Sequence, residues 1–400
     1  MSRETAPGTH KRPRVGILTL TQSENYGTVL QAYATRRIFE SLSSSLEFQL
    51  VPTDVRHVRR RRLQSLVNPR NPNTGITRIN NFLSMRRFIR SELAPAGRYI
   101  DIKKRTAAIE HLNQGFEALI TGSDEVWNLA FVGAQSLYYL PHGAGRYRAS
   151  FATSANRLDI DALDSQDRNL LHNSLKSYSY LSVRDTNTRN FLRDLDLSLD
   201  PIEIVDPTLV YDFPEAEPRR RLGSVVGSME SHILLMVRDR HIASSLITYF
   251  ADVWPQSEIH TVFIKHAHTK YLRIDPLEFA GVFSEYDLVI TDFFHGTCMS
   301  IRNRAAFICF DSETIYDKYE SKIANLVRKL GLTGNYVNIA NIGRQEGLNT
   351  LYALAAKILD GKYWSPDFEA ALARERITAR RVATEIVRQL EEELAVVDKR

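Results

Sequence analysis

Short apolar segments alternate with longer amphipathic segments through most of the chain. In the first half, runs rich in β-branched residues predict strands, and each is followed by apolar residues at helical spacing, with Asn25 as the cap of the first helix. The predicted strands cover 14–21, 46–54, 116–121, 148–155 and 180–185, and the predicted helices cover 26–42, 81–94, 106–114, 163–178 and 188–195.

The second half repeats this alternation. Predicted strands cover 232–238, 258–265, 287–292 and 306–311, and predicted helices cover 242–253, 276–286 and a segment opening at His295. Strands that alternate with helices are typical of parallel sheets, so the pattern predicts an α/β protein with two Rossmann-like domains that face a cleft.

The domain boundaries follow from where this pattern breaks. We expect a disordered tail over 1–13, an N-terminal domain over 14–210, a C-terminal domain over 222–345 and a helical segment over 349–400. Proline and charge interrupt the pattern at 206–221, which predicts the hinge. The long charged helix after 367 either folds back onto the first domain or pairs subunits in a homo-oligomer.

Composition narrows the function classes. The 400 residues are 43% hydrophobic, with a net charge of only +5, which does not by itself argue for nucleic acid. No stretch approaches the roughly 18 apolar residues of a membrane span, so no transmembrane segment is expected. Only Cys298 and Cys309 are present, so no disulfide framework is available and a cytoplasmic location is expected.

One basic run, RHVRRRR at 56–62, resembles a nucleic-acid patch. We interpret it as a solvated face, because no aromatic residues interleave it for base stacking. We therefore expect no nucleic-acid partner. The basic surface could instead bring the protein to anionic lipid headgroups at the inner face of the membrane, although no amphipathic anchor is clear.

Polar turns follow predicted strands at four places in both halves: SENYGT, GSDEVWN, the pair Arg184 and Asp185, and TDFFHG. In an open parallel sheet, ligands bind at the carboxyl ends of the strands. Four such turns predict a single cleft between the domains.

The turn at 291–297 carries the strongest signal. A helix that opens at His295, Gly296 and Thr297 presents free backbone N–H groups to the cleft, which suits a phosphate or carboxylate. Gly296 would let the backbone approach the ligand, and His295 could donate to a phosphoryl oxygen or carry a proton. Arg184 either clamps an anion or forms an ion pair with Asp185 or Asp206.

The remaining turns supply acceptor-side candidates. Asp124, beside Ser123, either serves proton transfer and acceptor hydroxyls or caps a helix. Tyr26 and Trp127 either stack on a sugar ring or fill the domain face, and Asn25 and Gly27 shape their loop. His266 and His268 lack a third ligand in a recognisable pattern, so no metal is expected. There is no Walker loop, GxGxxG or GxSxG pattern.

The segments NYGTVLQAYA, TGSDEVWN, SFATSA, SVRD, VDPTLVYD and ITDFFHGT, in that order, resemble the polysaccharide pyruvyl transferase family. The likeness runs from about Val15 to about Leu332. It implies a fold like the GT-B glycosyltransferases and transfer of pyruvate from phosphoenolpyruvate, as co-substrate without further cofactor, onto two hydroxyls of a glycan. The acceptor would be a saccharide or a lipid-linked saccharide.

The resemblance also implies roles for particular residues. Arg184 and Lys322 would hold the anionic donor, and His295 would bind its phosphate or act as general acid. Asp292 would orient His295 or cap the helix. Relatives commonly have serine where this chain has Phe293, which could narrow the donor site.

Two other functions remain open. A glycosyltransferase that uses a nucleotide sugar would share the same two-domain cleft, since fold does not settle function. A non-catalytic member of the family would keep the site only for binding.

Overall fold

The computed structural model describes residues 11–395 except 24, 55–71, 98–99, 102–104, 159, 198–199, 215, 217–230, 313–318 and 362–367. Most of the predicted N-terminal tail, the basic run at 56–62 and residues 215 and 217–221 of the predicted hinge lie outside the described residues.

The first domain is built on a parallel four-stranded sheet of order β2-β1-β5-β6. Its strands are β1 (Arg14–Leu18), β2 (Glu47–Leu50), β5 (Ala118–Thr121) and β6 (Tyr147–Ser150). Single bridges continue this sheet beyond β6 towards the small parallel pair β7 (Ser182–Val183) and β8 (Ile202–Glu203). The strands β3 (Thr53–Asp54) and β4 (Ile100–Asp101) form a second parallel pair.

The second domain holds a parallel six-stranded sheet of order β11-β10-β9-β12-β13-β14. Its strands are β9 (His232–Met236), β10 (Glu258–Thr261), β11 (Lys270–Tyr271), β12 (Leu288–Thr291), β13 (Phe307–Asp311) and β14 (Tyr336–Asn338). Every residue of β9, β12 and β13 is buried, because helices cover both faces of a parallel sheet.

Helices follow the strands in both domains. In the first domain and the segment after it they are α1 (Tyr26–Leu42), α3 (Pro72–Phe88), a π-helical turn (Ile89–Leu93), α4 (Arg105–Gly115), α5 (Leu129–Val132), α6 (Ser165–Leu175), α7 (Thr186–Asp194) and α8 (Pro207–Val210). In the second domain and after it they are α9 (Arg240–Val253), α10 (Pro276–Gly281), α11 (Phe294–Arg302), α12 (Lys322–Lys329), α13 (Ile339–Ile342), α14 (Arg344–Leu359) and α15 (Phe368–Ala395).

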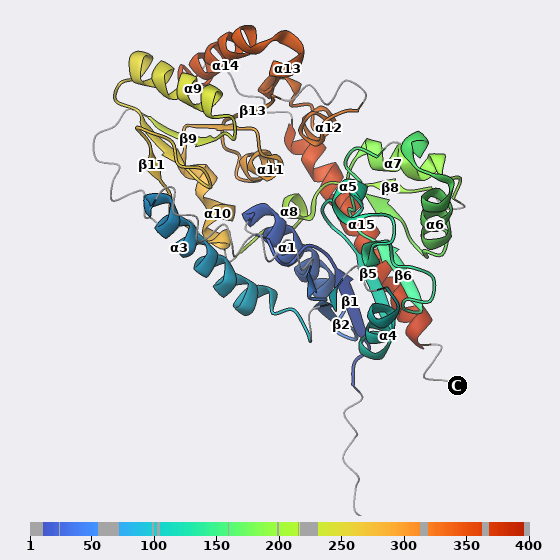
Figure 1. The fold of residues 1–400 in the computed structure, drawn as a ribbon. Coiled ribbons are helices and arrows are strands. Elements are labelled where there is room, and N and C mark those ends of the chain that lie inside the picture. The colour runs from blue at the N-terminus through green and yellow to red at the C-terminus, as the bar shows by residue number, and fades with distance from the viewer. Residues whose placement is uncertain are drawn as a thin grey trace, which may run out of the picture.

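The two domains are joined at their centre by α1, α8 and α11 (Figure 1). Side chains also bond across the boundary: the Tyr26 hydroxyl donates to the Ile274 carbonyl at 2.7 Å, and the Asn325 amide donates to the Thr186 hydroxyl at 2.8 Å. These contacts hold the carboxyl ends of the two sheets close to each other.

The predicted C-terminal helical segment divides in two. Helix α14 contributes Leu348, Leu351, Ala355 and Ile358 to the core around the second sheet. Helix α15 instead returns to the first domain, where it packs along α1 and β6 (Figure 1). It buries residues at helical spacing, and Gln389 accepts a hydrogen bond from the Tyr147 hydroxyl at 3.0 Å. Folding back is therefore the outcome seen in this chain.

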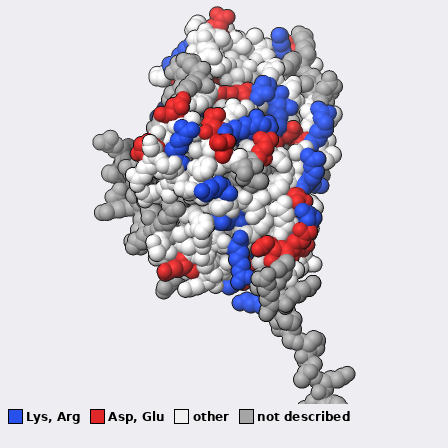
Figure 2. All heavy atoms as spheres, turned by 90° about the vertical axis from the view of Figure 1, so that its right-hand side faces the viewer, with Lys and Arg blue, Asp and Glu red and all other residues white. Residues whose placement is uncertain are grey.

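None of the described helices combines the length and apolarity needed to cross a membrane. On the face shown in Figure 2, the Lys and Arg side chains are interspersed with Asp and Glu. Among the described residues, no three His, Cys, Asp or Glu side chains are placed to share a metal ion.

Candidate functional site

A cavity of about 150 Å³ lies where α11 begins, at the carboxyl ends of the second sheet. The residues that line it come from the start of α1, from β9, α10, α11 and α12, and from the segments that follow β9, β10 and β12: Asn25, Met236, Arg238, Phe263, Phe279, Asp292, Phe293, Phe294, His295, Gly296 and Lys322. Five residues predicted from the sequence therefore share one cavity: Asn25, Asp292, His295, Gly296 and Lys322.

The start of α11 forms one wall. Its N-cap is Phe293, whose side chain accepts no hydrogen bond, and the Thr297 N–H donates to the Phe293 carbonyl at 3.0 Å. The first N–H groups of a helix have no intrahelical acceptor, so this end offers donors and a positive dipole to an anion.

Gly296 and Thr297 are placed differently from the expectation that both face a ligand. A side chain at Gly296 would overlap the Thr291 hydroxyl, so glycine is needed here for packing of α11 onto β12. The Thr297 side chain is buried, and its hydroxyl donates to the Phe293 carbonyl at 3.3 Å. Because the Thr297 N–H donates to the same carbonyl, neither the hydroxyl nor the N–H of Thr297 is free for a ligand.

His295 is held by two neighbours that are distant in sequence. Its Nε2 atom lies 3.8 Å from a carboxylate oxygen of Asp206. A Cβ atom added to Gly27 would overlap the imidazole, so the glycine at the start of α1 makes room for this ring. The sequence predicted that Gly27 shapes its loop, but it did not predict the contact with His295.

The carboxylate that pairs with His295 in the structure is Asp206, whereas the sequence suggested Asp292. Asp206 caps α8, and its second oxygen accepts from the Thr208 N–H and hydroxyl at 3.0 and 2.7 Å. Burial alone would raise the pKa of Asp206, but nearby His295 and Arg184 hold it well below its usual value.

Arg184 forms an ion pair with Asp206, which was the second of the two roles predicted for it. Its Nη1 atom donates to Asp206 at 2.8 Å and lies 3.5 Å from Asp124. Burial lowers the pKa of Arg184, but these carboxylates raise it above its usual value. The Nε and Nη2 atoms are buried and have no hydrogen-bond partner among the described residues.

Phe294 separates Arg184 from the cavity. The guanidinium lies 4.6 Å from the centre of the ring, and the Lys322 ammonium lies 5.6 Å from it. Arg184 lines a much smaller space of about 10 Å³ behind Phe294. Arg184 and Lys322 were both predicted to hold the donor. Both lie against Phe294, but only Lys322 lines the larger cavity.

Lys322 opens α12 and crosses to the first domain. Its ammonium lies 2.5 Å from the Glu125 carboxylate, and a third of the side chain is exposed. Burial would raise the pKa of Glu125, but Lys322 and then Arg184 lower it to about 2. Glu125 is thus a charged partner of the predicted donor site that sequence reasoning did not single out.

Asp292 binds Arg238 instead of His295. Its two oxygens accept from the Arg238 backbone N–H at 3.2 and 3.1 Å, and one also accepts from Arg238 Nε at 3.3 Å. The Arg238 guanidinium in turn lies 5.4 Å from the Phe293 ring centre. Sequence reasoning missed Arg238, although it ends the strand predicted over 232–238, and a polar residue at a strand end was a usable signal.

Asp292→Asn is expected to flatten the pH dependence of stability between about pH 4 and pH 6. Burial raises the pKa of Asp292 from 3.8 to about 6, although Arg238 opposes this shift. Between these values the folded protein keeps a proton that the unfolded chain has released, so stability falls as pH rises, by up to about 3 kcal/mol. Urea unfolding at several pH values would measure the slope, with the exposed Asp200→Asn as control. Parallel slopes in wild type and Asp292→Asn would contradict this assignment.

The acceptor-side candidates are less accessible than predicted. Trp127 is fully buried, stacked on Tyr139, and its indole N–H donates to the Tyr138 carbonyl at 3.0 Å. Because no face of the ring is free, this structure corrects the expectation that Trp127 stacks on a sugar. Tyr26 is also buried, with its ring against Phe263 and Phe279, so it fills the domain interface.

Ser123 and Asn25 have local roles. The Ser123 hydroxyl is buried and donates to the Gln31 amide oxygen, so it is not free for an acceptor. Asn25 caps α1 by accepting from the Gly27 N–H at 3.0 Å, and its exposed side chain lines the cavity. Asp124 accepts from the Glu125 N–H at 2.9 Å, as a turn cap does, in addition to its contact with Arg184.

Comparisons with known proteins give the family of the chain. The polysaccharide pyruvyl transferase family matches residues 25–314 of the chain. The chain belongs to this family. A search of curated proteins found no significant match.

Solved structures that resemble this pyruvyl transferase family member include sugar enzymes. UDP-GlcNAc 2-epimerase from Methanocaldococcus jannaschii, in complex with UDP-GlcNAc and UDP, has a TM-score of 0.54 at 12% identity, covering 96% of this chain and 100% of that one. A putative UDP-N-acetylglucosamine 2-epimerase from Listeria monocytogenes has a TM-score of 0.54 at 11% identity, covering 96% and 98%. At such identities the likeness shows the fold alone, which is GT-B-like.

Proposed function

We propose that this protein transfers pyruvate from phosphoenolpyruvate to two hydroxyls of a saccharide acceptor, forming a cyclic ketal and releasing phosphate. The observation that carries the proposal is the small cavity at the start of α11, with Arg238, His295 and Lys322 on its wall. Membership of the polysaccharide pyruvyl transferase family supports the reaction class.

The size of the cavity favours this donor over a nucleotide sugar. A volume of about 150 Å³ lies below the roughly 300–1,000 Å³ of pockets for larger ligands. Phosphoenolpyruvate is small and carries both a phosphate and a carboxylate. Two cationic side chains and the uncapped N-terminus of α11 match those two anionic groups.

In the proposed reaction, a proton is added to the methylene carbon, C3, and one acceptor hydroxyl bonds to C2. The C2–O bond to phosphate then breaks, and the second hydroxyl closes the ketal. The two hydroxyls lose two protons, of which one balances the proton added to C3 and the other leaves with phosphate. No oxidant or reductant is needed.

In this reaction, we assign the following roles to the described residues. Lys322, Arg238 and the α11 N–H groups bind the two anionic groups of the donor. His295 donates the proton to C3 or holds the phosphate, and Asp206 positions its ring. Asp292 is the second proton donor to consider, since its pKa is raised to about 6. Arg184 can reach the donor only if the Phe294 ring moves aside, and Asp124, which lies 3.5 Å from Arg184, does not line the cavity.

For the acceptor, we propose only a class of compound. A saccharide or lipid-linked saccharide fits the family, and Asn25 lies on the first-domain side of the cavity. We also propose that the protein is located in the cytoplasm, including the inner face of the membrane. Phe293 narrows the cavity wall where relatives commonly carry serine.

Calorimetric titration with phosphoenolpyruvate tests the donor. We expect binding to wild type that is weakened about tenfold or more in Lys322→Ala, because a charge-assisted contact contributes about 1.5–3 kcal/mol. Arg328→Ala, which removes an exposed cation from the same helix, is the matched control and should bind normally. Binding of a nucleotide sugar in place of phosphoenolpyruvate would favour glycosyl transfer. Binding of neither would favour a non-catalytic role.

A further inference from the structure

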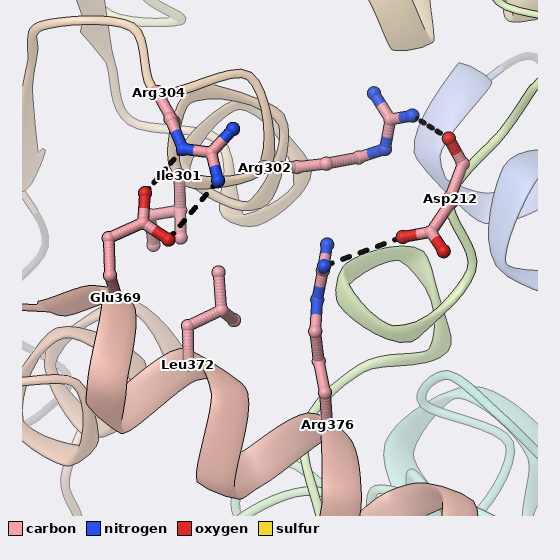
Figure 3. Close-up of a pocket in the computed structure, with 7 residues that line it drawn as sticks. All are labelled: Asp212, Ile301, Arg302, Arg304, Glu369, Leu372 and Arg376. Atoms are coloured by element: carbon pink, nitrogen blue, oxygen red, sulfur yellow. Dashed lines mark hydrogen bonds and ion pairs between the residues drawn. The ribbon is translucent and has the colours of Figure 1, made fainter.

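A second cavity of about 160 Å³ lies outside the cleft. It is bordered by the carboxyl end of α11, the segment after α8 and the first turns of α15 (Figure 3). Its lining residues are Asp212, Ile301, Arg302, Arg304, Glu369, Leu372 and Arg376. The cavity thus lies where the second domain meets the connecting segment and the C-terminal helix.

Positive charge exceeds negative charge around this cavity. Arg380 adds a fourth guanidinium, at 3.3 Å from Asp212, whose other oxygen lies 3.4 Å from Arg376. Glu369 pairs with Arg304 through both oxygens. The four arginines therefore share two carboxylates, and a net charge of about +2 remains among these six side chains.

Arg302 donates its hydrogen bonds to backbone carbonyls and, at 3.4 Å, to the Asn303 amide oxygen, rather than to a carboxylate. Its Nη1 atom donates to the Ala280 carbonyl at 3.0 Å, and Nη2 donates to the Asp212 carbonyl. Its Nε atom is buried and has no hydrogen-bond partner among the described residues. A partly buried charge that only neutral acceptors contact is costly, so an anion nearby would lower the free energy.

The electrostatics of the cluster agree with this geometry. Burial, and then repulsion by Arg376, lowers the pKa of Arg302 to about 10, and Asp212 only partly opposes the shift. Burial likewise lowers the pKa of Arg376. For both guanidiniums, burial and repulsion by neighbouring cations therefore lower the pKa more than the Asp212 carboxylate raises it.

We propose that this cavity binds a phosphate-type oxyanion, either inorganic phosphate or the phosphate group of a phosphomonoester. Its volume corresponds to about five water molecules at roughly 30 Å³ each, which is enough for one tetrahedral anion. Guanidinium forks match such oxygens, and Ile301 and Leu372 supply an apolar wall (Figure 3).

The site is separate from the cleft, and it does not depend on the proposed function. A bound anion would join α11, α15 and the segment after α8. Because α11 begins beside His295 and ends at Arg302, the anion would also fix the far end of the helix that carries the cleft histidine. An anion that binds only the folded chain raises its melting temperature.

Thermal unfolding and calorimetry of the full chain with sodium phosphate, at constant ionic strength, test the proposal. Arg304→Gln is the first variant, because 71% of its side chain is exposed and its loss should not impair folding. Arg376→Gln is the second. We expect each to weaken phosphate binding about tenfold or more. Arg388→Gln, on the same α15 but paired with Glu385 and Glu392, should bind as wild type does.

Lys322→Ala separates this site from the cleft. Phosphate affinity that survives in Lys322→Ala but is lost in both arginine variants supports the proposal. The reverse pattern, or no phosphate binding by wild type at millimolar concentrations, overturns it. Glycerol 3-phosphate as a second probe identifies the source: competition with inorganic phosphate points to phosphomonoesters, and its failure to compete points to the free anion.

Discussion

Replacing Arg184 by leucine is expected to lower the free energy of unfolding by about 3–5 kcal/mol, because it leaves the buried Asp206 carboxylate without its closest cation. The Arg184 side chain is 3% exposed and Asp206 is fully buried, and the two are joined at 2.8 Å. The remaining partners of Asp206 are the Thr208 donors and His295 at 3.8 Å.

A matched control lies five residues further along the chain. Arg189→Leu removes an arginine that pairs with Asp200 at 3.8 Å in a partly exposed position. Exposed ion pairs contribute about 0–1 kcal/mol, so this variant should unfold almost as wild type does. Urea unfolding of both variants gives the comparison. Equal losses in Arg184→Leu and Arg189→Leu would show that the buried pair does not contribute as described.

The double variant Arg184→Leu with Asp206→Asn distinguishes charge from packing. Removing both charges leaves no unpaired carboxylate, while the amide oxygen that replaces the carboxylate would still accept from Thr208. We therefore expect the double variant to regain most of the lost stability without regaining turnover. Recovery of turnover as well would mean that neither charge is needed for the position of His295.

The alternation of strands and helices in the sequence was enough to predict two parallel-sheet domains. The cap at Asn25 and the polar residues after β12 also fell where expected, because they depend on local chemistry. The start of helix α14 was predicted incorrectly. The sequence pattern predicted a helical segment that begins at 349, whereas α14 begins at Arg344 and packs on the second sheet.

The missed or misassigned site residues depend on long-range packing. Trp127 stands in a polar turn, but the turn folds its ring onto Tyr139, which no local pattern indicates. Asp206 was considered only as an ion-pair partner, although Asp before Pro207 is a recognisable helix start. Its position beside His295 arises because α8 and α11 meet between the domains.

His295→Asn is expected to reduce turnover by about 10²–10⁴-fold while the fold is retained, if the imidazole supplies the proton to the donor. Asparagine removes the imidazole and keeps a polar side chain in the space beside Gly27. His266→Asn is the control, because both histidines are 8% exposed and the His266 Nε2 atom interacts with the Val237 carbonyl outside the cavity lining. Phosphate release and unfolding would be measured together.

The pH–rate profile then assigns the proton donor. If His295 donates, Asp206→Asn should lower turnover, because it removes the carboxylate 3.8 Å from Nε2 that positions the ring, while Asp292→Asn should leave the pH–rate profile unchanged. If His295→Asn instead retains turnover within about tenfold of wild type, the imidazole only positions the donor. Loss of a limb near pH 6 in Asp292→Asn would then identify Asp292, whose pKa is about 6, as the acid.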